Sequence, residues 1–128
     1  MKNTLTLFKA LSDRNRLRIV ASLMHYNELC ACQITELLQV SGATASRHLS
    51  ILNASGLTES RKEGRWVYYR LSADPKTINR FNALMDWIKN EIVLSDDVVN
   101  DLQTMKSILK QKREDLCRKQ RGVSCCPV

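Results

Sequence analysis

The residues of this sequence with the most obvious chemistry are its cysteines. Two lie one residue apart near the start of the chain and three lie near its end: Cys30, Cys32, Cys117, Cys125 and Cys126. Because five is an odd number, a fully paired disulfide framework cannot use them all. The sequence does not open with the charged stretch and apolar run of a signal peptide, so we expect a cytoplasmic protein with reduced thiols. Such thiols bind soft metal ions, react, or pack as small core residues.

Length and charge narrow the class of protein. The 128 residues fit one domain with its own hydrophobic core. The net charge is +7, and most of the excess lies in the first 71 residues, which suits a polyanion such as DNA and equally a solvated surface. No segment approaches the ~18 consecutive apolar residues of a membrane span, so we expect no membrane partner.

Apolar periodicity places the elements around these thiols. It predicts four helices, two strands and two longer helices, in this order: 3–11, 14–25, 33–39, 43–54, 57–62, 65–71, 74–92 and 95–116. A turn at residues 40–42 separates the third and fourth helices, and Glu63-Gly64 forms the tip between the strands. Two helices joined by a glycine-bearing turn and followed by a basic hairpin describe a winged helix-turn-helix. We therefore expect a mainly α fold with a β-hairpin wing.

The two longer helices carry apolar stripes at 78–92 and 98–116. These stripes are too long for so small a core to cover alone, so core packing explains part of them and a dimer seam the rest. We therefore expect a homodimer that forms through the terminal helices and reads a palindromic operator. Residues 1–94 would form the DNA-binding and dimerisation domain, and residues 95–128 a C-terminal helix and cysteine-bearing tail.

The second helix of a helix-turn-helix enters the major groove, where short and hydroxylated side chains allow close approach and arginine can fork onto guanine. The candidate contacts there are Ser41, Ala43, Thr44, Ser46, Arg47, His48 and Ser50. His48 lies on the flank of this helix, where it could touch a phosphate or pack beneath the helix. The wing offers three cations for phosphate contact: Arg61, Lys62 and Arg65.

Several of these motifs, in this order, resemble the ArsR/SmtB family of metal-sensing bacterial repressors, and its arsenic-sensing branch in particular. The matching stretches are Phe8-Lys-Ala-Leu-Ser-Asp, Arg16-Leu-Arg-Ile, Glu28-Leu-Cys-Ala-Cys, Ser46-Arg-His-Leu, Ser55-Gly-Leu and Gly64-Arg-Trp-Val-Tyr-Tyr-Arg-Leu. The resemblance implies a homodimeric winged helix that represses metal-resistance genes and leaves DNA when it binds its ion. It also implies that this chain is not an enzyme. Indeed, we find no glycine-rich phosphate loop and no cysteine beside an evident base.

The resemblance also defines where this chain departs from the arsenic-sensing pattern. That branch carries Cys-x-Cys and a third cysteine three residues later, and Cys30 and Cys32 match the first two. The third position is Thr35, whose hydroxyl is a poor ligand for a soft ion. The family's other common site binds zinc through Asp and His on the fifth helix, but His25 and His48, the two histidines of this chain, lie elsewhere.

Three interpretations of the thiols therefore remain open. Cys30 and Cys32 could bind an ion with a third thiol from the C-terminal set, in the same or the other chain. Cys117, Cys125 and Cys126 could form a three-thiolate site of their own. In the third interpretation, the first pair fills the core and the C-terminal thiols are incidental.

The leading functional hypothesis is a repressor of an arsenic-resistance operon that As(III) or Sb(III) releases from DNA. One alternative keeps the DNA-binding module but takes disulfide formation as its input. Another is a zinc- or cadmium-thiolate sensor.

Overall fold

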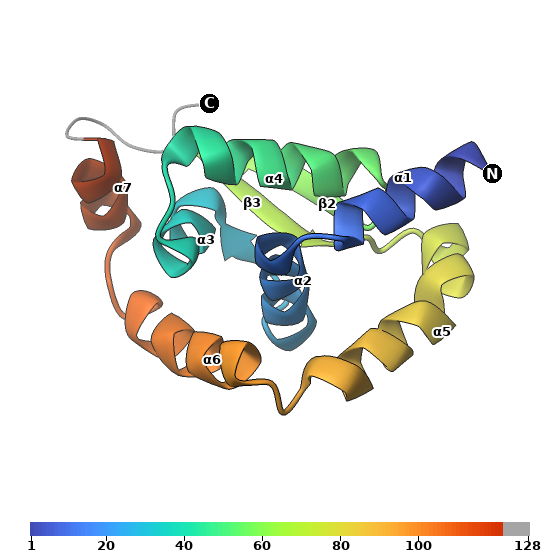
Figure 1. The fold of residues 1–128 in the computed structure, drawn as a ribbon. Coiled ribbons are helices and arrows are strands. Elements are labelled where there is room, and N and C mark those ends of the chain that lie inside the picture. The colour runs from blue at the N-terminus through green and yellow to red at the C-terminus, as the bar shows by residue number, and fades with distance from the viewer. Residues whose placement is uncertain (122–128) are drawn as a thin grey trace.

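The computed structural model describes residues 1–121, so Cys125 and Cys126 lie outside the described residues. Its elements, in chain order, are α1 (Lys2–Leu11), α2 (Arg14–His25), β1 (Leu29–Cys30), α3 (Ala31–Leu38), α4 (Gly42–Ala54), β2 (Thr58–Glu63), β3 (Trp66–Leu71), α5 (Pro75–Ile92), α6 (Asp96–Ile108) and α7 (Arg113–Arg121). The central helices and the small sheet lie between α5 on one side and α6 and α7 on the other (Figure 1). This is the expected winged helix-turn-helix, extended at its C-terminus by two helices.

The starts of the helices follow from capping side chains. Asp13 accepts a hydrogen bond from the backbone of Arg16 at the start of α2, and Ser41 accepts one from Thr44 at the start of α4. Ser95 caps α6 in the same way. Such caps satisfy backbone N–H groups that have no partner inside the helix. The helix starts predicted at residues 14, 43 and 95 are confirmed to within a residue.

The sheet has one strand more than predicted. Its order is β1-β3-β2 with antiparallel pairing, and β1 places Cys30 opposite Tyr68. The hairpin of β2 and β3 turns at Gly64, whose φ of 61° is a conformation that glycine adopts without steric cost. The sequence analysis missed β1 because two residues are too short to show an alternating pattern.

The C-terminal region differs most from expectation. The predicted last helix is two helices, α6 and α7, with a break after Ile108. Its apolar stripe packs inside its own chain against α2 and α3, where Met105, Ile108 and Leu116 are at most 2% exposed. These side chains therefore belong to the part of the stripe that core packing explains, and a share of this region in a dimer seam stays a prediction. Among the apolar residues that do remain exposed are Leu5 and Phe8 on α1 and Ile78 and Trp87 on α5.

No helix within residues 1–121 combines the length and the apolar character needed to cross a membrane.

The packing of α6 can be tested by truncating one buried side chain. Met105 is 0% exposed, whereas Leu109 on the same helical stripe is 39% exposed. We expect Met105→Ala to lower the free energy of unfolding by about 2–5 kcal/mol, the usual cost of truncating a buried large apolar side chain. Leu109→Ala, the matched control, should cost clearly less. Urea unfolding at one protein concentration measures both, and equal losses would contradict the intrachain packing of α6.

Candidate nucleic-acid interface and thiol site

The helix-turn-helix is formed by α3 and α4. Gln39, in the left-handed conformation at φ 54°, ends α3 and turns the chain toward α4. On α4 the side chains of Ala45, Leu49 and Leu52 are at most 1% exposed and face the core. The predicted outer residues are exposed: Ala43, Thr44, Ser46, Arg47 and Ser50. These candidate contacts therefore lie on the solvent-facing side of α4, while their contact with DNA stays a prediction.

Ser41 and Thr44 stand where α4 begins. Both are exposed, and the Ser41 hydroxyl donates a hydrogen bond of 3.0 Å to the Thr44 hydroxyl while accepting one from the Thr44 backbone. Their hydroxyls therefore shape the first turn of the recognition helix, whose N–H groups favour a phosphate.

His48 is placed differently from the other candidates. It is 7% exposed, and its Nδ1 lies 3.1 Å from a guanidinium nitrogen of Arg16 and 3.9 Å from a carboxylate oxygen of Asp13. Arg16 also donates to the carbonyl of Ala10, so His48 belongs to a cluster that joins α1, α2 and α4. This placement favours the packing interpretation of His48, and its contact with DNA stays a prediction.

The three wing cations have unequal roles. Arg61 forms a two-pronged ion pair with Glu28, at 2.6 and 2.8 Å, and a second pair with Glu63 at 2.9 Å. Its guanidinium also lies 4.5 Å from the centre of the Tyr68 ring, and the hydrogen bond to Glu28 raises its pKa. Lys62 and Arg65 are exposed near the turn of the hairpin. We infer that Arg61 braces the wing, whereas Lys62 and Arg65 are its available cations.

The first two thiols converge as their spacing predicted. Cys30 ends β1 and caps α3, where its backbone N–H donates to the side chain of Gln33 at 2.8 Å. Cys32 lies in the first turn of α3, and its Sγ is 3.3 Å from that of Cys30. Both residues are at most 2% exposed. An ion placed between them would contact both sulfurs with little movement of the backbone.

The structure brings a third thiol to the same region. Helix α7 packs against α3, and Cys117, which is 1% exposed, shares a cavity of about 100 Å³ with Cys32. Thr35 also lines this cavity, but its hydroxyl donates to the carbonyl of Ala31 at 2.8 Å. Within residues 1–121, no three His, Cys, Asp or Glu side chains are already arranged as a metal site. An ion that uses all three thiols therefore has to draw Cys117 and the α3 pair together.

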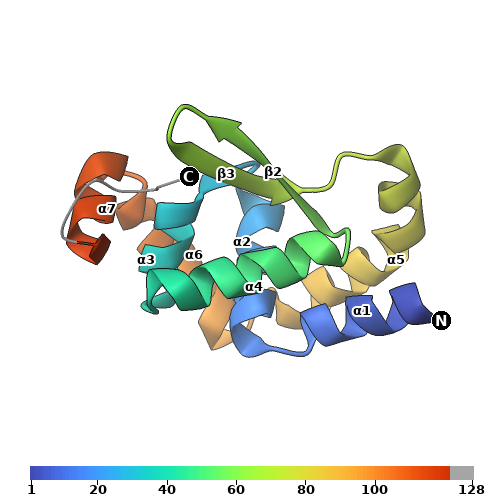
Figure 2. The same ribbon diagram turned by 90° about the horizontal axis from the view of Figure 1, so that it is seen from above.

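Polar contacts attach α7 to α3 around these thiols. Lys119 forms an ion pair with Glu36 at 2.7 Å, and the hydrogen bond from Lys119 lowers the pKa of Glu36. Gln120 donates to the backbone carbonyl of Cys32 at 2.9 Å. Figure 2 shows α7 beside α3, close to the end of α4 that begins the recognition helix. The thiol region and the DNA-reading elements are therefore neighbours.

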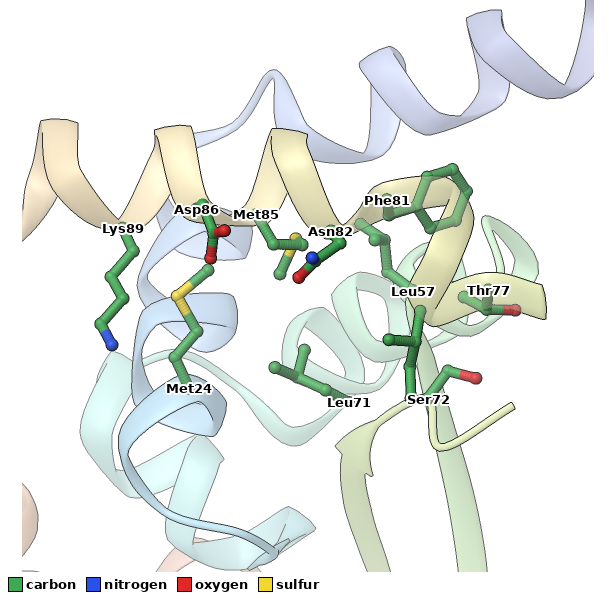
Figure 3. A pocket seen from close by; sticks show the side chains of 11 residues that line it. Met24, Leu57, Leu71, Ser72, Thr77, Phe81, Asn82, Met85, Asp86 and Lys89 are labelled. Carbon is green, nitrogen blue, oxygen red and sulfur yellow. The ribbon is translucent and has the colours of Figure 1, made fainter. Parts of the chain in front are cut away.

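A larger cavity lies under α5 and lacks comparable chemistry. It has a volume of about 260 Å³, and its apolar lining includes Leu57, Phe81 and Met85, with Asp86 and Lys89 among its polar residues (Figure 3). It contains no cysteine or histidine. We therefore place the candidate sensor at the thiols rather than in this cavity.

Comparison with known proteins agrees with this architecture. A family model described as bacterial regulatory protein, arsR family, matches residues 13–60. A homodimeric winged helix-turn-helix domain from Mycobacterium bovis, a possible ArsR-family transcriptional regulator, is 30% identical, with a TM-score of 0.58 over 71% of this chain and 82% of that one. This chain belongs to the ArsR family.

Two curated relatives of this ArsR-family protein carry names that specify an input. The arsenical resistance operon repressor of Escherichia coli K12 is 50% identical over 52% of this chain and 56% of its own length. The cadmium resistance transcriptional regulatory protein CadC of Listeria innocua is 50% identical over 48% of this chain and 52% of its own length. This chain thus spans about half the length of these curated relatives.

The family match contains Cys30 and Cys32, whereas α5, α6 and α7 lie beyond its last residue. The proximity of Cys117 to Cys32 is therefore a feature that the ArsR family match does not cover. The sequence analysis left this proximity as one of three open interpretations, because it depends on how α6 packs and on the break between α6 and α7.

The unequal roles of the wing arginines can be tested by their effect on DNA binding. We expect Arg65→Ala to weaken binding to specific and random DNA alike and to reduce the slope of log K against log salt by about one contact, as for a lost phosphate contact. Arg61→Ala should instead leave that slope nearly unchanged and lower thermal stability, because Arg61 braces Glu28 and Tyr68. Fluorescence anisotropy across a salt series measures the slopes, and equal slope changes for both variants would contradict the assignment.

Proposed function

We propose that this ArsR-family protein is a repressor of an arsenic-resistance operon that leaves its operator when As(III) or Sb(III) binds the thiolates of Cys30, Cys32 and Cys117. The observation that carries this proposal is the convergence of these thiols. Two sulfurs lie 3.3 Å apart, and α7 lines the adjoining cavity with the third cysteine. Soft thiolate ligands select soft ions, and trivalent arsenic takes three of them.

The binding reaction is redox-neutral. Arsenous acid, As(OH)₃, exchanges its three hydroxyls for three cysteine sulfurs. Each thiol gives up one proton, each As–OH bond is replaced by an As–S bond, and three water molecules leave. The arsenic stays trivalent, so no oxidant or reductant takes part.

The protein leaves DNA if the ion binds most tightly to a protein conformation that binds DNA weakly. A ligand shifts an equilibrium only through its different affinities for the two states. The described thiols do not form a ready three-ligand site, so closing them on an ion changes the contact of α7 with α3. Since the first turn of α4 lines the same cavity through Gly42 and Ser46, this change reaches the recognition helix.

The choice of thiols can be tested one by one with arsenite. Replacement by serine removes a soft ligand and keeps nearly the same volume. We expect Cys30→Ser, Cys32→Ser and Cys117→Ser each to raise the arsenite concentration for half-release of operator DNA by about tenfold or more, a loss of about 1.4 kcal/mol in binding. The matched control, Cys125→Ser combined with Cys126→Ser, should respond like the parent.

The opposite pattern would overturn this assignment. If the control fails to respond while Cys30→Ser and Cys32→Ser behave like the parent, the ion binds the C-terminal thiols instead. Two other inputs are distinguished in the same assay. Release by cadmium but not by arsenite would favour a cadmium-thiolate sensor, as the name of one relative suggests. Release by a thiol oxidant, with no response to arsenite under reducing conditions, would favour a redox sensor.

We also propose that the protein is a homodimer that uses α1 and α5. Helix α5 has one buried residue, Ile88, and leaves Ile78 and Trp87 47% and 61% exposed. Leu5 and Phe8 of α1 are also about half exposed, and Figures 1 and 2 both show α1 on the same side of the molecule as α5. An apolar surface of this kind suits a two-fold partner on a palindromic operator.

Because Ile78 is exposed and Ile88 is buried, only the first is a clean test of this surface. We expect Ile78→Glu to shift the protein from dimer to monomer at micromolar concentration while the fold is retained, since a charge is costly inside an apolar interface. Lys76→Glu on the same helix is the matched control. Sedimentation velocity with circular dichroism measures both properties, and a parent that is monomeric with and without DNA would contradict the proposal.

A further inference from the structure

The first residue of α7, Arg113, touches both the thiol region and the wing. Its backbone carbonyl lies 4.0 Å from the Sγ of Cys32, as the acceptor of a weak S–H contact. Its guanidinium donates a hydrogen bond to the hydroxyl of Tyr68 in β3. The same guanidinium lies 5.4 Å from the centre of the Trp66 ring and 5.5 Å from that of Tyr68, within the range of cation–π attraction.

The wing residues that Arg113 holds are themselves connected to the wing cations. Tyr68 is 9% exposed, and the guanidinium of Arg61 lies over its ring. Trp66, at the hairpin end of β3, lies under the guanidinium of Arg65 at 5.3 Å. Displacement of Arg113 would therefore disturb the support of both cations at once.

Helix α7 can transmit movement between the thiol region and the wing, because Arg113 and Cys117 are four residues apart. Residues at this spacing lie on the same face of a helix, one turn apart. Cys117 faces the thiol cavity, while Arg113 reaches the wing. A displacement of Cys117 toward Cys32 would therefore also displace the backbone of Arg113, from which its guanidinium reaches β3.

We propose that Arg113 is a positioning residue that couples ion binding at the thiols to the orientation of the wing. The inference rests on the proposed function, since it assigns to that site its route to the DNA-binding surface. When Cys32 becomes a ligand it loses its proton and can no longer donate to the carbonyl of Arg113. At the same time the ion draws Cys117 toward α3, and the guanidinium loses its fit to Trp66 and Tyr68.

Arginine is suited to this role because its planar guanidinium can stack on an aromatic ring and donate hydrogen bonds within its own plane. Lysine keeps the charge but lacks both the plane and the fork. Arg113→Lys therefore removes the coupling geometry with little change in net charge. Tyr68→Phe removes the hydroxyl acceptor and keeps the ring. The matched control is Arg118→Lys, because Arg118 lies on the same helix, is 69% exposed and pairs with Asp115 of α7.

The test measures three quantities for the parent and each variant: operator affinity without arsenite, operator affinity at saturating arsenite, and arsenite affinity of the free protein. In the parent and in Arg118→Lys we expect arsenite to weaken operator binding by about 5–150-fold, the usual range of such coupling. In Arg113→Lys and Tyr68→Phe the ratio should fall below about threefold, with arsenite still bound. A merely structural role would lower operator affinity in both states and leave the ratio unchanged.

A fluorescence measurement follows the contact directly. In a Trp87→Phe background, the emission of Trp66 should change when arsenite is added to the parent and stay constant in Arg113→Lys. An unchanged coupling ratio in both Arg113→Lys and Tyr68→Phe, with a parent that releases DNA, would overturn the role of Arg113 and leave the proposed function standing. A parent that binds no arsenite, or keeps its DNA when arsenite is bound, would overturn the proposed function and this inference together.

Discussion

The side chain of Arg18 joins three helices, and the position of the C-terminal pair depends on it. Its guanidinium forms a two-pronged ion pair with Asp101 of α6, at 2.8 and 2.9 Å, and donates to the carbonyl of Leu37 at the end of α3. The side chains of Arg18 and Asp101 are 20% and 9% exposed. Such paired charges are costly to separate, because removal of one leaves the other buried without compensation, at about 3–5 kcal/mol. The pair thus favours one position of α6, with Met105 and Ile108 in the core.

The position of α6 determines where α7 can lie. The break after Ile108 is short, so α7 must start close to the end of α6. From there Arg113 reaches β3, while Lys119 and Gln120 reach α3. Cys117 lies between these attachments and therefore faces the thiol region. An ion pair between α2 and α6 thus contributes to the arrangement of the cysteines between α3 and α7.

This dependence explains what the sequence could and could not predict. Helix spacing and the glycine-bearing turns are local signals, and they predicted the helix-turn-helix and the wing. The convergence of Cys30 and Cys32 is also local, since two residues around a bend must lie close together. One partner of Arg61, Glu28, lies 33 residues away, and His48 packs against Arg16, 32 residues away. No short pattern encodes such pairs, so the sequence analysis counted Arg61 among the phosphate contacts and left His48 open between phosphate contact and packing.

For a related reason, the sequence could not divide the C-terminal stripe between the core and a dimer seam. A run of apolar residues at helical spacing shows that a face is buried, but not whether its own chain or a partner buries it. The ion pair of Arg18 and Asp101 indicates that the chain itself buries the apolar face of α6, because the pair fixes the polar edge of this helix against α2. The exposed apolar residues of α1 and α5 have no comparable anchor among residues 1–121, and this difference is why the partner surface is placed there.

If the sensor takes one ligand from α7, its affinity for the ion depends on tertiary structure. Ligands within one helical turn bind an ion without reporting on tertiary structure, because their spacing is nearly the same in every folded state. A ligand on α7 makes the affinity depend on how α7 lies against α3 and the wing. Linkage is reciprocal, so the factor by which the ion weakens operator binding is also the factor by which the operator weakens ion binding. In the proposed sensor Thr35 stands where a local third thiol would, so part of the binding energy would go to the α3–α7 contact, where it can act on the DNA-reading surface.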